Sequence, residues 1–260
     1  EAKTLNVQNV MTTKFVCKVE CNRDNTTDKY KARWVGRGFS QREGVDYFQT
    51  HSPVMRSASF RLILSLIAKK RLRAKEFDLS SAFVTADVKE NVFVRPPVPM
   101  NLPKGTLLKL NKSLPGCKQS GRNFSREFSD HLVSLGFRQC TSDACVFACD
   151  KGNDYAVVGI HVDDGILASS NASLEAKILQ GLQSKYQLGC IRDPEQFLGL
   201  AIDMCSDGSV TLHARKYILD LAQRLNLADA NPVKTPAVTG QTLKPGEIDG
   251  SHPYRELVGS

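Results

Sequence analysis

Two adjacent carboxylates carry the clearest chemical signal in the chain. Asp163 and Asp164 lie between two apolar, β-branched runs in the segment YAVVGIHVDDGILASS at 155–170, and Gly165 follows them directly. This pattern predicts a β-hairpin whose tip carries the charge. At the rim of a buried sheet, neighbouring carboxylates are costly unless a cation lies between them. Oxygen ligands of this kind suit Mg²⁺ or Mn²⁺ better than Zn²⁺.

The same residues also fit a simpler interpretation, because Asp-Gly is a common hairpin turn. The pair alone does not decide between a polar turn and a metal site. Zinc is disfavoured separately, because the eight Cys residues include no C-x-x-C pair and no two His residues lie three to five positions apart. Scattered single Cys residues, with no secretion signal visible at the start, predict reduced thiols of an intracellular protein.

The basic charge is concentrated in the N-terminal part. The chain of 260 residues has a net charge of +8, and residues 1–75 hold 16 Lys and Arg against 6 Asp and Glu. This asymmetry indicates a face for phosphate groups, and a solvated basic surface is the alternative. No apolar run approaches the roughly 18 residues of a membrane span. We therefore expect a soluble protein with no membrane partner.

Strands and helices alternate irregularly around these residues. Cationic and apolar residues alternate at 29–39, so that Lys29, Lys31 and Arg33 should point the same way along one strand. Asp78 lies in a short extended run. Further strands are predicted at 14–20, 92–94, 107–110, 144–149 and 197–203, with a polar turn at 22–28, and helices at 57–70, 173–186 and 214–226 and before Gly136.

Two glycines interrupt the basic strand. Gly36 and Gly38 lie beside Arg37 and Arg42. Because glycine lets a backbone approach a ligand closely, amides and side chains here are together a candidate phosphate contact.

At this point the order of the segments is recognisable. Seven blocks follow one another from about Lys14 to the end: KARWVGRGFSQREGVDYFQTHSPV, FRLILSLIA, FDLSSAF, SLPGCKQSGRNF, HVDDGILA, FLGLAID and YILDLAQRL with NPVKTP. Together they resemble the reverse transcriptase domain of copia-type LTR retrotransposon polyproteins. The colinear order of the blocks makes this resemblance more specific than any single motif.

The resemblance implies an α+β protein with the right-hand polymerase fold, in which fingers, an antiparallel-sheet palm and a helical thumb surround the site. The implied ranges are fingers at 1–53 and 87–121, palm at 54–86 and 122–203, thumb at 204–236, and a linker at 237–260 toward a missing ribonuclease H region.

The resemblance also assigns the carboxylates. By motif position Asp78, Asp163 and Asp164 match the three palm carboxylates that hold two Mg²⁺ ions, which Mn²⁺ can replace. Two-metal catalysis agrees with this match, because ions roughly 3.5 to 4 Å apart stabilise both the attacking and the leaving oxygen of a displacement.

Four further residues match nucleotide contacts of the family. Phe83 matches the aromatic that rejects a ribose 2′-hydroxyl by collision, and a core Phe is the alternative. Lys31 and Arg33 match cations that clamp the triphosphate, with a solvated strand as the alternative. Gln119 matches a loop Gln near the nucleotide sugar, and a polar residue at a helix start is the alternative.

The chain departs from the family pattern at several positions. His161 stands where Tyr is usual, Pro115 and Cys117 replace Tyr and Leu, Phe124 replaces Trp, and Val84 to Asp87 replaces an Asn-Gly turn. None of these changes removes a metal ligand. The leading hypothesis is an RNA-directed DNA polymerase. Its rivals are an inactive copy that only binds nucleic acid and another palm-type two-metal nucleotidyltransferase.

The resemblance implies partners as well. They are an RNA or DNA template with its primer, dNTPs, an integrase fused on the N-terminal side and a ribonuclease H on the C-terminal side. Glu1 in place of an initiator Met fits a piece of such a polyprotein. An intracellular, cytoplasmic location in a virus-like particle follows from the same resemblance.

Overall fold

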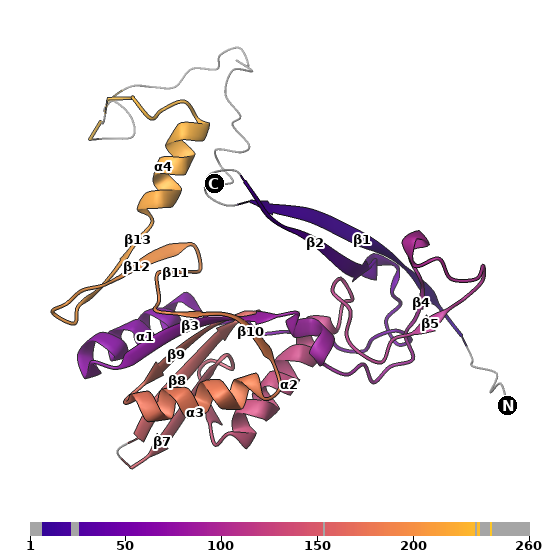
Figure 1. Ribbon diagram of the computed structural model, residues 1–260, viewed down its shortest axis with the longest axis horizontal. Coiled ribbons are helices and arrows are strands. Elements are labelled where there is room, and N and C mark those ends of the chain that lie inside the picture. The colour runs from indigo at the N-terminus through magenta and orange to yellow at the C-terminus, as the bar shows by residue number, and fades with distance from the viewer. Residues whose placement is uncertain (1–6, 22–25, 153, 232, 235–239, 241–260) are drawn as a thin grey trace. The chain divides into compact units, whose positions relative to one another are not determined.

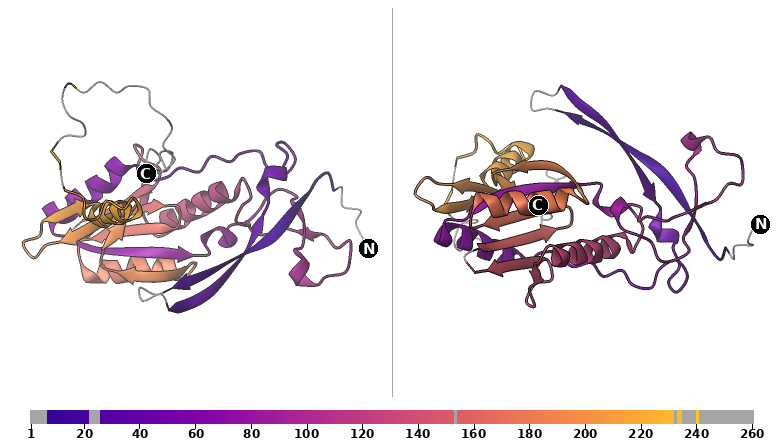
Figure 2. Two further views of the ribbon diagram at one scale, coloured as in Figure 1. Left: turned by 90° about the horizontal axis from the view of Figure 1, so that it is seen from above. Right: turned by 60° about the horizontal axis from the view of Figure 1, so that its bottom comes forward.

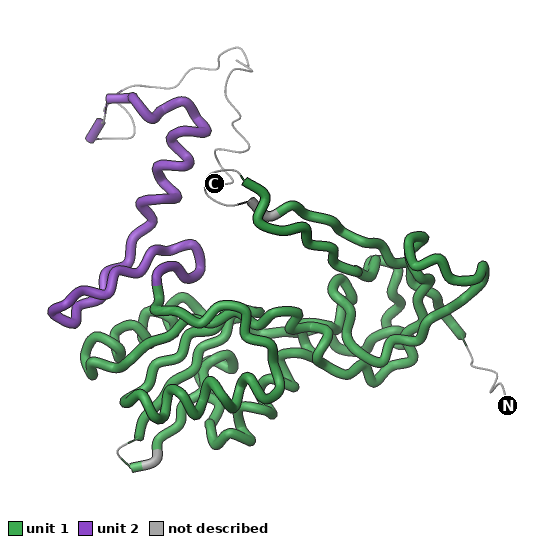
Figure 3. Tube along the Cα trace, in the orientation of Figure 1, with its two compact units in different colours: residues 1–194 green, residues 195–260 purple. Residues whose placement is uncertain are grey.

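The computed structural model shows a mixed arrangement of helices and strands (Figure 1), which confirms the predicted α+β class. It describes residues 7–21, 26–152, 154–231, 233–234 and 240. The chain divides into two compact units, residues 1–194 and 195–260 (Figure 3). The predicted linker at 237–260, apart from residue 240, lies outside the described residues, as do positions 22–25 of the predicted turn.

The larger sheet of the first unit has six antiparallel strands in the order β10-β3-β9-β8-β7-β6. The strands are β3 (Arg73–Ser80), β6 (Arg138–Gln139), β7 (Val146–Lys151), β8 (Asp154–His161), β9 (Asp164–Ser169) and β10 (Gln187–Arg192). The apolar runs at 144–149 and 155–170 predicted β7, β8 and β9. Strand β10 has no such signal, because nearly all of its residues are exposed.

Helices cover both faces of this sheet (Figure 2). Gly159 in β8 faces α1 (Ser57–Lys70), because a Cβ at this glycine would lie 2.8 Å from Ile63 Cδ1. Neighbouring strand residues face opposite ways, so Val158 points to the other side. There its cross-strand partner Phe147 packs against Phe128 of α2 (Ser120–Ser134).

The third helix lies on the same side as α2. The His131 ring of α2 is hydrogen-bonded through Nε2 to the Gly181 carbonyl oxygen of α3 (Ala172–Gln183) at 2.9 Å. The predicted apolar stripes of α1 and α2 are confirmed as core faces. Their fully buried members are Phe60, Ile63, Leu64, Ile67, Phe124, Phe128 and Leu132.

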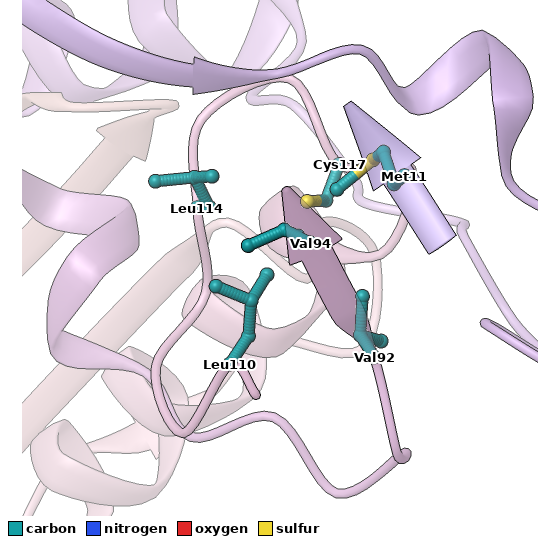
Figure 4. Close-up of a cluster of buried hydrophobic side chains, with 6 residues drawn as sticks. All are labelled: Met11, Val92, Val94, Leu110, Leu114 and Cys117. Carbon is teal, nitrogen blue, oxygen red and sulfur yellow. The ribbon is translucent and has the colours of Figure 1, made fainter. Parts of the chain in front are cut away.

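A four-stranded sheet forms the other part of the first unit. Its order is β2-β1-β4-β5, from β1 (Val10–Cys21), β2 (Thr27–Gly36), β4 (Phe93–Arg95) and β5 (Leu108–Lys109). Short 3-10 turns follow at η1 (Gly38–Ser40), η2 (Ala82–Thr85) and η3 (Val98–Met100). A buried apolar cluster (Figure 4) packs under it from Met11, Val92, Val94, Leu110, Leu114 and Cys117.

The glycines after β2 serve backbone packing. The Gly36 amide donates to the Pro115 carbonyl at 2.8 Å, and the Gly38 amide donates to the Gly116 carbonyl at 3.1 Å. A Cβ on Gly38 would lie 2.2 Å from the Gly116 oxygen. The expectation that these backbone amides contact a phosphate is therefore wrong, because both are already used inside the protein.

The second unit holds a small sheet and a helix. Its elements are β11 (Gln196–Phe197), β12 (Leu200–Met204), β13 (Val210–His213) and α4 (Arg215–Arg224). The single strand predicted at 197–203 is wrong, because Leu198 and Gly199 both have positive φ, at 52° and 77°. That conformation turns the chain back on itself and splits the strand into a hairpin. No helix in the described ranges is long and apolar enough to span a bilayer.

A buried carboxylate joins the start of α1 to the turn before β7. Asp143 accepts hydrogen bonds from the Arg56 amide at 3.0 Å, the Ser59 hydroxyl at 2.5 Å and the Cys145 amide at 2.9 Å. Burial disfavours its charged form, but these hydrogen bonds outweigh burial and lower the pKa of Asp143 below its ordinary value. The carboxylate therefore stabilises this packing most when it is ionised.

We predict that Asp143→Ala lowers the free energy of unfolding at pH 7 by about 1–3 kcal/mol, because three donors lose their acceptor. A carboxyl with a lowered pKa contributes stability above its unfolded pKa, and this contribution disappears as the pH falls through the folded pKa. The deficit measured by urea unfolding should therefore shrink from pH 7 to pH 3. Ser59→Ala, which removes one donor, should cost less, and an equal deficit at both pH values would contradict this role.

Candidate active site

The three carboxylates predicted from the sequence meet at one end of the six-stranded sheet. Asp78 in β3 is the direct cross-strand partner of Asp164 in β9. The Leu79 amide donates to the Asp163 carbonyl at 2.8 Å, which ties the hairpin turn to β3. Side chains directly opposite each other on antiparallel strands lie on the same face. Asp78 and Asp164 therefore share a face, with Asp163 in the adjoining turn.

The turn itself consists of Val162 and Asp163, between the paired residues His161 and Asp164. Val162 has a φ of 60°, which a β-branched residue rarely adopts. Strain of this kind persists where surrounding structure over-determines the backbone, and it is concentrated at functional sites. The predicted hairpin is confirmed, with Asp163 in its turn and Asp164 as the first residue of the returning strand.

Glycine is needed at position 165 for a different reason from the one that its sequence context suggests. It lies within β9 opposite Phe77, and a Cβ at Gly165 would lie 2.1 Å from the Phe77 ring. The ring of Phe77 covers this glycine on the face opposite the carboxylates, since strand residues alternate. The Asp-Gly turn that the sequence also allowed is therefore wrong.

The carboxylates repel one another electrostatically. Burial, followed by the charges of Asp163 and Asp78, raises the pKa of Asp164 above its ordinary value, and Glu76 adds to the rise while His161 opposes it. Among the described residues, no three His, Cys, Asp or Glu side chains already close around a point that would hold a metal ion. The accumulated charge and the all-oxygen donor set nevertheless fit a hard divalent cation, which would relieve the repulsion.

A fourth carboxylate near this group is paired with an arginine. Glu76 in β3 is only 7% exposed and forms an ion pair with Arg192 Nε of β10. Sequence reasoning missed this pair, because β10 has no strand pattern of its own to place Arg192 beside β3.

Phe83 lies beside the hairpin turn. Its ring lies 6.0 Å from the Phe124 ring, edge to face, and it lines a largely apolar cavity of about 220 Å³. Val54, Ile160 and Val162 line the same cavity. Phe83 is thus close to the residue that precedes Asp163. Its predicted role against the 2′-hydroxyl stays a prediction.

Gln119 is fully internal. It is 1% exposed, its Oε1 accepts from Gln41 Nε2 at 3.0 Å, and its own Nε2 donates to the Asp46 carbonyl at 2.8 Å. Both ends of the amide therefore hold the loop after β2 against the start of α2. Nothing in the sequence spacing of Gln41 and Asp46 indicated this network. The predicted contact of Gln119 with a nucleotide stays a prediction.

The two predicted triphosphate cations lie in the other sheet. Lys31 and Arg33 belong to β2, where they pair with Lys18 and Val16 of β1, and alternation places them on one face of this ribbon as expected. The structure therefore brings Asp78, Asp163 and Asp164 together and leaves these cations on a separate element (Figure 1).

Comparison with known proteins adds the family. A family model described as "Reverse transcriptase (RNA-dependent DNA polymerase)" matches residues 4–239. The retrovirus-related Pol polyprotein from transposon RE1 of Arabidopsis thaliana is 30% identical and aligns with 92% of this chain and 17% of the polyprotein. The retrovirus-related Pol polyprotein from transposon TNT 1-94 of Nicotiana tabacum is 32% identical and aligns with 86% of this chain and 17% of the polyprotein. The chain thus spans about 17% of the length of these relatives.

Two solved structures show weak similarity. The foamy viral protease-reverse transcriptase dRH in complex with ds DNA is 14% identical, with a TM-score of 0.39 over 74% of this chain and 30% of that chain. Apo telomerase from Candida Tropicalis is 12% identical, with a TM-score of 0.37 over 78% of this chain and 55% of that chain.

The family match extends over almost all of the chain and confirms the resemblance seen in its sequence blocks. The relatives are Pol polyproteins of transposons. The protein therefore belongs to the reverse transcriptase (RNA-dependent DNA polymerase) family, in the form found in the Pol polyproteins of copia-type retrotransposons.

Proposed function

We propose that this chain is the polymerase domain of a Pol polyprotein and extends a primer 3′ end with dNTPs on an RNA or DNA template. The observation that carries this proposal is the pairing of Asp78 with Asp164 beside Asp163. Family membership supports nucleotidyl transfer as the reaction. Mg²⁺ is the proposed ion at two positions, and Mn²⁺ is an alternative.

Each residue has a proposed task. Asp78, Asp163 and Asp164 hold the ions, and their mutual repulsion prepares them to accept positive charge. Two divalent ions, when bound, supply the charge that favours ionisation of the primer hydroxyl and neutralises the triphosphate.

The remaining residues act on the nucleotide. Phe83 lies beside Val162 and excludes a nucleotide that carries a ribose 2′-hydroxyl. Lys31 and Arg33 contact the triphosphate, which requires the β1–β2 ribbon to approach the carboxylates. Gln119 supports the nucleotide sugar indirectly, because its buried amide holds the loop after β2 against the start of α2.

The proposal includes the division of the chain and its partners. We assign fingers to 1–53 and 87–121, palm to 54–86 and 122–203, and thumb to 204–236. In the full polyprotein an integrase would precede this domain and a ribonuclease H would follow it, and the polyprotein would act in a cytoplasmic particle.

A second candidate is an inactive copy that only binds nucleic acid. It is favoured by His161, which replaces the usual Tyr and whose buried Nδ1 has no hydrogen-bond partner among the described residues. A Mg²⁺-dependent primer-extension assay on poly-rA with oligo-dT separates the two candidates.

We predict that Asp78→Asn, Asp163→Asn and Asp164→Asn each abolish primer extension while template-primer affinity stays within a few fold. These groups hold ions, whereas affinity comes mainly from cations that meet phosphates. Extension at a near wild-type rate by any variant would remove that residue from the site.

The Asp164→Asn variant carries its own folding control. A carboxyl whose folded pKa is raised costs stability while it is charged, so Asp164→Asn should raise the metal-free Tm at pH 7. A Tm at or below the assay temperature would show that loss of activity came from loss of structure.

Phe83→Ala should allow incorporation of ribonucleotides, because the collision with the 2′-hydroxyl disappears. The measurement is the ratio of kcat/KM for dNTP over rNTP. Val84→Ala, at the exposed neighbouring residue, is the matched control. Unchanged discrimination in a folded Phe83→Ala would make Phe83 a packing residue of the cavity.

The basic N-terminal residues should produce a salt-dependent affinity. Log K for template-primer should fall linearly with log salt, with a slope of about −0.9 per duplex phosphate neutralised. Ala variants of Lys29, Arg37 and Arg42 should reduce that slope by up to about one unit each. Lys31→Ala and Arg33→Ala should instead mainly raise the dNTP KM or lower kcat.

Lys177→Ala is the control for these cations, because Lys177 lies exposed on α3, on the sheet face opposite the carboxylates. Its slope should equal that of the wild type. An unchanged slope and an unchanged dNTP KM in all five N-terminal variants would make the basic face ordinary solvated surface.

A further inference from the structure

Strand β10 contains a β-bulge opposite Asp78 of β3. The register of β10 against β3 shifts by one residue between Leu188 and Ile191. Gly189 and Cys190 therefore lie together opposite the single residue Asp78. Bulges occur preferentially at sheet edges and beside active sites, where they re-aim a side chain. β10 is such an edge strand.

The bulge brings the Gly189 backbone against the Asp78 side chain. A Cβ on Gly189 would lie 2.6 Å from Asp78 Oδ2 and 2.7 Å from Ser80 Oγ. The Ser80 hydroxyl also donates to Asp78 Oδ2 at 3.3 Å, so these two side chains occupy the space that a larger residue would need. The φ of Gly189 is not positive, so its backbone conformation does not demand glycine. Glycine is required here for room.

The extra residue of the bulge also decides which β10 residue pairs with Glu76, the other carboxylate of β3. After the bulge, Arg192 is the partner of Glu76 and forms its ion pair. With one residue fewer, Ile191 would stand opposite Glu76, because a shift of one position changes every pairing beyond it. Glu76 adds to the repulsion at Asp164. The bulge thus places Arg192 beside Glu76, whose negative charge would otherwise have no positive partner on β10.

We propose that Gly189 is a positioning residue for the metal-binding carboxylate of Asp78. Its missing side chain leaves the space in which Oδ2 rests against Ser80 and stays beside Asp164. The inference rests on the proposed function, because it concerns the same carboxylate. It adds a residue that no sequence block pointed to.

A substitution at Gly189 should disturb the site without disturbing the fold. The atoms that an added Cβ would meet are the ends of two short side chains and not backbone. They can turn away at little cost, and alanine in a strand is more favourable than glycine. Gly189→Ala should therefore keep the protein folded while it displaces the Asp78 carboxylate.

The test compares Gly189→Ala with Cys190→Ala, the exposed second residue of the same bulge. Mn²⁺ binding is measured by EPR on the full chain with a dideoxy-terminated primer-template and dNTP, so that no turnover is needed. The rate of primer extension is measured against Mg²⁺ concentration, and Tm is recorded without metal.

Gly189→Ala should weaken Mn²⁺ binding about 10- to 100-fold, the usual effect of disturbing a residue that orients a ligand. The Mg²⁺ concentration for half-maximal rate should rise with it, whereas template-primer affinity and Tm should stay near wild type. Cys190→Ala should behave as wild type in every measurement.

Wild-type Mn²⁺ binding by a folded Gly189→Ala would overturn the inference. Loss of folding in this variant, or an equal loss of Mn²⁺ binding in Cys190→Ala, would overturn it as well. If the wild type binds Mn²⁺ but extends no primer, the proposed function fails, and the Mn²⁺ comparison still decides the role of Gly189. If the wild type binds no Mn²⁺, both fail.

Discussion

The antiparallel pairing of β3 with β9 is the constraint on which the rest of the site depends. It places Asp78 opposite Asp164 and ties the turn at Asp163 to β3 by a backbone hydrogen bond. Like charges directly opposite each other destabilise a strand pair. The pairing therefore needs a source of stability elsewhere, and the remaining structure supplies it.

That stability comes from the apolar residues directly behind the carboxylates. Ile166 and Leu167 of β9 are completely buried, and the Phe77 ring covers Gly165 on the reverse face. Helix α1 packs on one face of the sheet, and α2 on the other. Each fully buried side chain of this size contributes about 1.5–3 kcal/mol. A few such residues outweigh the repulsion of partly exposed charges, so the sheet holds together a group of carboxylates that would not gather by themselves.

Sequence patterns predicted the elements whose side chains alternate between core and solvent. The apolar stripe of α1 and the hairpin around Asp163 are confirmed, because burial of one face leaves a periodic signal. The exposed edge strand β10 has no such period, and neither has the hairpin within 197–203, whose turn depends on positive φ at Leu198 and Gly199. The buried amide of Gln119 shows the same limit, since its partners Gln41 and Asp46 lie on a distant loop.

The sequence by itself determined the residues from which we propose the site, namely three carboxylates, an aromatic residue and a basic N-terminal part, in an order that resembles one family. Only the tertiary structure decided how the three carboxylates meet. The register of β3 against β9 pairs Asp78 with Asp164, which lie 86 positions apart in the chain. The bulge of β10 then brings Gly189 and Arg192 beside them. A strand pattern has a period of two whichever strand is its neighbour, so it states which face is buried and leaves the partner and register to packing.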